Sequence, residues 1–177
     1  MPDVNPRMGD RRGRSHSIDH GGCQDSPKVT IRDVNWRILG TAFVLNLAWE
    51  MVQMFAYAGM SQVSGRRLVV CLGAALGDAL YVMCVYWIGR GVRGTPLWIC
   101  KLNVGSVITV SLVGILTAAV IERFGIAEGL WAYRNNMPLL PFHIGLWPVL
   151  QFMITPILTF WVVRHWIHYE VRPRKTQ

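Results

Sequence analysis

The stretch that determines how this chain folds runs from Asn46 to Gln53 and reads NLAWEMVQ. It lies inside a hydrophobic run over residues 38–58, in which Glu50 is the only formally charged residue. At about 1.5 Å per residue, a helix of that length reaches about 31 Å, enough to cross the hydrocarbon core of a bilayer. Asn46, Glu50 and Gln53 are spaced i, i+4 and i+7, so they share one helix face. A carboxyl group in hydrocarbon costs about 2.5–3.5 kcal/mol, so this face should turn toward protein or water.

Three more hydrophobic runs follow, over residues 68–89, 102–121 and 138–163. Asp78 is the only charged residue of the second run, and the third and fourth contain no Asp, Glu, Lys or Arg. The sequence therefore predicts an all-α fold, a four-helix transmembrane bundle over residues 30–171. A soluble bundle would need polar helix faces that these runs lack. Pro148 and Pro156 predict kinks in the fourth helix, and the first residues of that run can lie at the membrane interface.

The composition fits a membrane protein. The chain has 177 residues and is only 16% charged, against about 25% in soluble domains. Its net charge of +8 does not indicate a nucleic-acid partner, because the basic residues flank the hydrophobic runs. The four cysteines form no CxxC pair, and the sequence indicates no metal site and no cofactor.

The basic residues also predict the orientation. Of the Lys and Arg residues, 14 lie before the first run, between the second and third runs, or after the fourth, and 4 lie in the other two loops. The positive-inside rule then predicts that both termini are cytoplasmic and that the loop over residues 122–141 faces outward. We expect a multi-pass protein of a bacterial inner membrane.

The two ends of the chain differ from the hydrophobic part. Residues 1–29 are polar and lack apolar periodicity, which predicts a disordered cytoplasmic tail, and residues 172–177 form a basic C-terminal tail. Thr30 followed by Asp33 is typical of a helix N-cap, so a helix should begin there and run into the membrane.

This topology predicts that polar side chains gather in the outer half of the membrane. Helix rise puts Glu50 about 10 Å and Asp78 about 15 Å below the outer surface, so the two acids should share one polar site. We take Glu50 and Asp78 as the candidate catalytic residues, because acids inside a membrane are functional by default. Glu122 and His143 are expected at the outer rim. The candidates for substrate contact or polar support are Asn46, Trp49, Gln53, Tyr81, Glu122, His143 and Gln151.

Several of these features have a purely structural interpretation. The amides of Asn46, Gln53 and Gln151 can join helices by hydrogen bonds without any further role. The GxxxG pattern from Gly73 to Gly77 favours close helix packing, and it would press Asp78 against a neighbour. Tryptophans and tyrosines near the ends of the runs, including Trp98, Trp131 and Tyr133, are typical of an interfacial aromatic belt.

The chemistry of paired acids leaves two functions open. Two desolvated carboxyl groups that lie close together favour holding a proton between them. A protonated acid in an apolar pocket suits protonation of an alkene or epoxide in a lipid-like substrate. The same group suits a proton relay.

The pattern Asn46-x-x-Trp49-Glu50 in a first transmembrane helix resembles the integral-membrane terpenoid cyclases of fungal meroterpenoid pathways. The resemblance implies that Glu50 is the acid that protonates an epoxide or alkene. Asp78 would be a second acid, although no motif matches it, and the fungal enzymes have more helices. The small bacterial lycopene cyclase subunits are similar in size and are also helical membrane proteins, but their Pro-x-Glu-Glu motif is absent here.

Two hypotheses follow. The first is a membrane enzyme that acts on an isoprenoid or other lipid, with Glu50 as general acid and Asp78 as its partner. The second is a non-enzymatic membrane protein, either a transport or proton-pathway component or an assembly factor of a membrane complex. The expected partners are a membrane lipid or lipid-like substrate, and a second copy of the chain or another membrane protein.

Overall fold

The computed structural model describes residues 29–58 and 65–171. Within these residues four α-helices are each long and apolar enough to cross a membrane, which confirms the predicted all-α four-helix fold of a multi-pass membrane protein. Residues 1–28 of the predicted tail over residues 1–29, and the predicted tail over residues 172–177, lie outside the described residues. The helices are α1 (Ile31–Gln53), α2 (Gly65–Arg93), α3 (Val104–Ala127) and α4 (Leu146–Val171).

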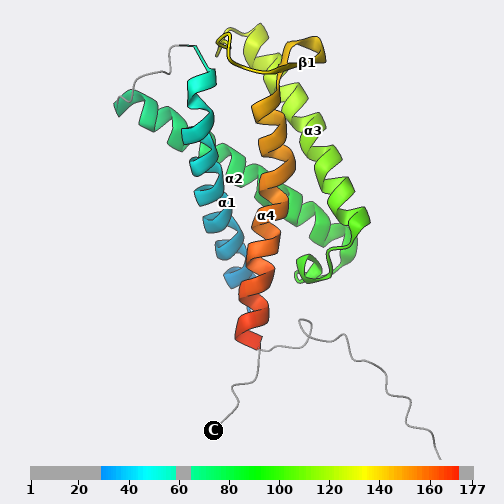
Figure 1. Cartoon of the computed structure of the whole chain (residues 1–177). Coiled ribbons are helices and arrows are strands. Elements are labelled where there is room, and N and C mark those ends of the chain that lie inside the picture. The colour runs from blue at the N-terminus through cyan, green and yellow to red at the C-terminus, as the bar shows by residue number, and fades with distance from the viewer. Residues whose placement is uncertain (1–28, 59–64, 172–177) are drawn as a thin grey trace, which may run out of the picture.

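α1 and α4 form the centre of the bundle, where they run side by side in opposite directions (Figure 1). α2 packs on α1 and crosses behind the central pair at an oblique angle, while α3 packs along α4. In α4 half of the most apolar stretch is buried, against 28% or less in each of the other three helices. α4 contacts each of those three helices, so it is the element on which the bundle is assembled.

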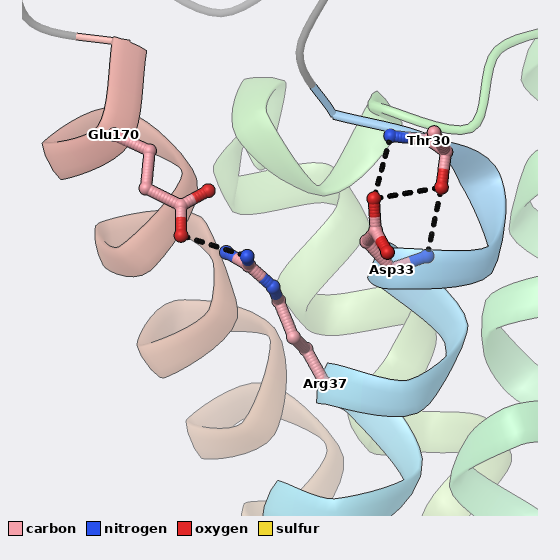
Figure 2. A network of polar contacts seen from close by, with 4 residues as sticks. All are labelled: Thr30, Asp33, Arg37 and Glu170. Carbon is pink, nitrogen blue, oxygen red and sulfur yellow. Dashed lines mark hydrogen bonds and ion pairs between the residues drawn. The ribbon is translucent and has the colours of Figure 1, made fainter.

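Hydrogen bonds fix the first turn of α1, which lies at the same end of the bundle as the end of α4. The predicted cap is confirmed, because the Thr30 hydroxyl accepts a hydrogen bond from the Asp33 backbone N–H and the Asp33 carboxylate accepts one from the Thr30 backbone N–H (Figure 2). One helical turn later, the Arg37 guanidinium donates to the Glu170 carboxylate of α4 at 2.7 Å. This ion pair joins the start of α1 to the end of α4. We call this the proximal end of the bundle.

The proximal half holds the larger apolar core. Ile38 of α1, Val82 and Tyr86 of α2, and Phe160 of α4 are fully buried there. The short 3₁₀ helix η2 (Trp98–Lys101) packs into the same core. Trp98 is 3% exposed and its indole N–H donates to the Tyr86 carbonyl, so its expected place in an interfacial belt is wrong.

The distal end, opposite the start of α1 and the end of α4, is built from irregular structure. The 3₁₀ helix η1 (Met54–Ala56) extends α1, so the α-helical part of the first span ends earlier than residue 58. Between α3 and α4 lie the antiparallel strands β1 (Leu139–Leu140) and β2 (Ile144–Gly145), joined by η3 (Pro141–His143) (Figure 1). In this hairpin Leu139 is opposite Gly145 and Leu140 is opposite Ile144.

The fourth helix therefore begins later than predicted, at Leu146 rather than at residue 138. Two physical features stop a helix from starting earlier. Pro138 and Pro141 lack a backbone N–H, and Phe142 has a left-handed φ of 67°, which belongs to a turn. Pro148 is the third residue of α4, where a helix N–H has no partner within the helix, so it gives no cause for the predicted kink.

Candidate functional site

A cavity of about 430 Å³ lies in the distal half of the bundle, and all four helices contribute to its wall. Its size falls within the range of about 300–1,000 Å³ that is typical of small-molecule sites. Most of the wall is apolar, and three carboxyl groups face it. The lining residues are Glu50, Gln53, Tyr57, Val70, Ala74, Gly77, Asp78, Tyr81, Ile121, Glu122, Trp131, Pro148, Gln151 and Phe152.

Gln151 of α4 brings the two candidate catalytic acids together. Its amide nitrogen lies 2.7 Å from the Asp78 carboxylate and 3.2 Å from the Glu50 carboxylate. One amide nitrogen therefore contacts both carboxyl groups, which brings them close together. Gln151 is 2% exposed, so its orientation is held by packing as well as by these bonds. The structure thus places Glu50 and Asp78 in one polar cluster, which agrees with the depths expected from helix rise.

A second amide supports Glu50 from its own helix. The Gln53 side-chain nitrogen donates to the Glu50 carboxylate at 2.8 Å and to the side-chain amide oxygen of Gln151 at 2.9 Å. The Trp49 indole N–H donates to the Gln53 oxygen at 3.1 Å and so fixes which end of the amide faces Glu50. Trp49 itself does not line the cavity but packs edge-on against Trp147.

Asn46 lies behind the cluster. It is fully buried, donates to the Ala42 carbonyl at 2.9 Å and accepts from the Gln151 nitrogen at 3.1 Å. An amide nitrogen has two hydrogens, and that of Gln151 faces acceptors on Asn46, Glu50 and Asp78. One of these three acceptors therefore receives no full hydrogen bond from Gln151. A proton held by the Glu50 and Asp78 carboxyl groups would supply the missing hydrogen bond.

Glu122 forms a second polar cluster on the same cavity. It was expected at the outer rim of the third span, but α3 continues to Ala127, and Glu122 is 4% exposed within the helix. Its carboxylate accepts a hydrogen bond from the Tyr133 hydroxyl and longer ones, both 3.4 Å, from the Tyr57 hydroxyl and the Trp131 indole. Burial and the neighbouring Glu122 raise the pKa of Tyr57 and the pKa of Tyr133 above the ordinary tyrosine value, so both phenols stay protonated donors.

These aromatic residues come from a connection that the sequence does not mark as functional. The backbone of residues 132–134 pairs with that of residues 56–58, through bonds from Ala58 N to Ala132 O and from Arg134 N to Ala56 O. A side chain at Gly125 would lie 2.0 Å from the Trp131 ring, so the bare glycine lets the indole reach the cavity. The positions of Trp131 and Tyr133 near the ends of hydrophobic runs predicted an aromatic belt, and no pattern marked Tyr57 as a site residue. No helical or strand periodicity relates the positions of these three aromatic residues to that of Glu122.

The remaining candidates divide between the cavity and the surface. Tyr81 lines the cavity, with its ring 4.8 Å from that of Phe152. His143 does not line it, because its residue is exposed at the turn between β1 and β2, where it has a φ of 58°. The left-handed turn that joins the two strands accounts for the exposed position of His143.

The charges of the cavity are unbalanced. Its described lining residues include Glu50, Asp78 and Glu122 but no Lys, Arg or His. Within residues 29–58 and 65–171, no three His, Cys, Asp or Glu side chains gather closely enough to hold a metal ion. Buried carboxylates without a counter-charge are costly, so protons or a positively charged species must neutralise them. The arrangement can therefore donate a proton or stabilise a cation.

Neither a protein-family model, nor a curated protein, nor a solved structure matches this chain, so its functional assignment depends on the geometry of this cavity.

Proposed function

We propose that this protein is a membrane enzyme that protonates an isoprenoid or similar lipid substrate in the distal cavity, with Glu50 as general acid and Asp78 as its partner. The observation that carries the proposal is that one amide, that of Gln151, joins two carboxyl groups in an apolar cavity that no described basic residue lines. Such an environment favours a carboxyl group that keeps its proton until a substrate accepts it.

The proposed reaction is balanced within the substrate. The Glu50 carboxyl group gives its proton to an alkene carbon, whose π electrons form the new C–H bond, or to an epoxide oxygen as the C–O bond opens. A carbocation remains, and a second double bond can attack it to close a ring. Loss of a proton from the product cation to the ionised pair of Glu50 and Asp78 restores the acid.

The aromatic lining supports the cationic stage. Tyr57, Tyr81, Trp131 and Phe152 all contribute to the cavity wall. Aromatic rings attract positive charge through their quadrupole, by about 2 kcal/mol or more where the site is desolvated. The resemblance of Asn46-x-x-Trp49-Glu50 to membrane terpenoid cyclases points the same way, since Trp49 and Asn46 hold the amides that contact Glu50. We place the enzyme in a bacterial inner membrane, with the cavity in the outer half.

The second candidate, a proton or solute pathway, is supported by the same three acids but opposed by the proximal core. Beyond Gln151 the buried polar side chains of α4 are Thr155 and Thr159, and each hydroxyl donates to a backbone carbonyl of its own helix. Ile38, Val82 and Phe160 are fully buried in the same half, so among the described residues no buried carboxyl or imidazole group continues from Asp78 to the proximal end. A proton relay needs such a route through the whole membrane. Protonation chemistry within a single cavity needs none.

The decisive experiment uses the purified full chain in lipid nanodiscs with prenyl alkenes and prenyl epoxides as trial substrates in D₂O. With an alkene substrate, an acid-initiated isomerisation gives a product of the substrate's composition that carries one carbon-bound deuterium from solvent, which mass spectrometry detects. With an epoxide the deuteron goes to a hydroxyl oxygen and exchanges with water, so that product is identified as a chromatographically separate isomer of the substrate. The matched variants are Glu50→Gln, which keeps size and hydrogen bonding but has no acidic proton, and Glu128→Gln, whose carboxyl lies exposed beyond α3.

We expect the Glu50→Gln variant to fold normally and to lose about 10²–10⁴-fold in rate, the range ascribed to general acid–base catalysis. The Glu128→Gln variant should keep the wild-type rate. Normal deuterium incorporation by the Glu50→Gln variant would rule out Glu50 as the acid, and no turnover of any prenyl substrate by the wild type would count against the enzyme itself.

A further inference from the structure

The cavity reaches the outside of the bundle along α2 and α3. Val70 is 46% exposed and Ile121 is 39% exposed, although both line the cavity. Ala74 and Gly77 of α2 are likewise both exposed and part of its wall. All four lie within the helices long enough to cross a membrane, so their exposed sides face hydrocarbon rather than water.

No tight helix packing seals this side. α2 packs mainly on α1, and α3 on α4, so the cavity lies where the two pairs diverge. Figure 1 shows α2 leaning away from α3 toward the distal end. A Cβ added at Gly77 would meet nothing within 4 Å, whereas one at Gly114, between α3 and α4, would lie 2.3 Å from the Phe152 carbonyl oxygen. The glycine of α2 therefore borders open space.

The distal end is covered instead. The paired backbones of residues 56–58 and 132–134 lie there, and Tyr57 and Trp131 project from them into the cavity wall. The hydrogen bonds from Tyr57 and Trp131 to Glu122 hold both rings on that side. A molecule coming from water would have to separate this pairing, but one coming from the bilayer would not.

We infer that the cavity is filled sideways from the membrane through a lateral portal made by Val70, Ala74, Gly77 and Ile121, and that its occupant is the hydrocarbon chain of a membrane lipid. Since no charged side chain stands in the portal, a saturated or isoprenoid chain passes it without desolvating an ion. The chain's reactive end meets Glu50 and Asp78, and this last point alone rests on the proposed function.

The experiment tests the portal without needing turnover. The probe is a farnesol chain that carries a photoreactive diazirine, added to the full chain in nanodiscs, with labelled residues located by mass spectrometry. The portal variant is Gly77→Phe, which places a ring in the open space beside the cavity. Its matched control is Gly91→Phe, near the C-terminal end of the same helix, where a Cβ also meets nothing within 4 Å and the residue does not line the cavity.

We expect wild-type protein and the Gly91→Phe variant to be labelled at cavity residues such as Phe152 and Gln151, and the Gly77→Phe variant to lose that labelling by about tenfold or more. A melting curve that matches wild type shows that the Gly77→Phe variant is folded. Where its fold fails, Gly77→Val serves as the smaller obstruction.

Two results would refute the portal, and a third would separate the portal from the proposed enzyme. Undiminished cavity labelling in the Gly77→Phe variant would refute the portal while leaving the acid chemistry of Glu50 untouched. Equal loss in the Gly91→Phe control would also refute it, because the effect would not be specific to the portal. Full labelling of the wild type together with a failed turnover assay would support the portal and reject the proposed enzyme.

Discussion

At the scale of single residues, the two acid clusters differ in how far the sequence could reveal them. Glu50 and Asp78 are lone charges in long apolar runs, and the fixed rise of a helix was enough to place them at similar depth. Gln151 followed from the same arithmetic. The partners of Glu122 did not, because Tyr57, Trp131 and Tyr133 lie on irregular backbone, where no period relates sequence position to direction.

Tyr133 provides the first prediction at this scale. Its hydroxyl donates to Glu122 and accepts from the Gly145 backbone N–H at 2.9 Å, so it joins α3 to the hairpin before α4. Replacing Tyr133 by Phe leaves both partners short of a hydrogen bond and should lower the free energy of unfolding by about 1–3 kcal/mol. Thermal unfolding in detergent measures the loss.

The control for this change is Tyr169→Phe, because Tyr169 is 79% exposed on α4. Removing its hydroxyl should leave the melting temperature unchanged. Equal melting temperatures for the two variants would mean that the Tyr133 hydroxyl does not support the fold.

At the scale of elements, the sequence located the helices well but misplaced their ends. Hydropathy detects the part of a helix that meets hydrocarbon, and α2 and α3 extend beyond it through polar or charged turns such as those at Arg90 and Arg123. The hairpin over residues 139–145 was read as helix because Leu, Ile and Phe make it apolar. Short apolar runs do not distinguish a strand pair from a helix end.

Gly114 gives a prediction about how two elements meet. A methyl group there would overlap the Phe152 carbonyl, so the substitution Gly114→Ala must push α3 away from α4. Such overpacking should cost about 1–3 kcal/mol of stability. Reversible unfolding in SDS, followed by circular dichroism, measures it.

The matched change is Gly40→Ala on α1, where a Cβ meets nothing within 4 Å. It should be neutral or slightly stabilising, because alanine favours a helix more than glycine does. A Gly114→Ala variant as stable as the Gly40→Ala variant would show that α3 and α4 do not pack as closely as described.

At the scale of the whole molecule, the fold implies an even number of membrane crossings, since α1 starts and α4 ends at the proximal end (Figure 1). The charge bias predicts which side that end faces. A reporter enzyme fused after Lys175 should be active in the cytoplasm, and one inserted near Asn135 should be active on the opposite side. The same side for both fusions would contradict the topology, and exchanged sides would contradict the cytoplasmic termini.

The central position of α4 has a consequence for how the protein is made. Helices leave the ribosome in sequence order, so α1 and α2 must enter the membrane before the Gln151 amide exists to join Glu50 and Asp78. The nascent chain thus passes through a stage at which two acids lack their main partner and α3 lacks the helix it packs on. Any message truncated before codon 146 would leave a product fixed in that stage, a natural target for membrane proteases. Completion of the last helix is thereby the step that turns an inserted chain into a folded one.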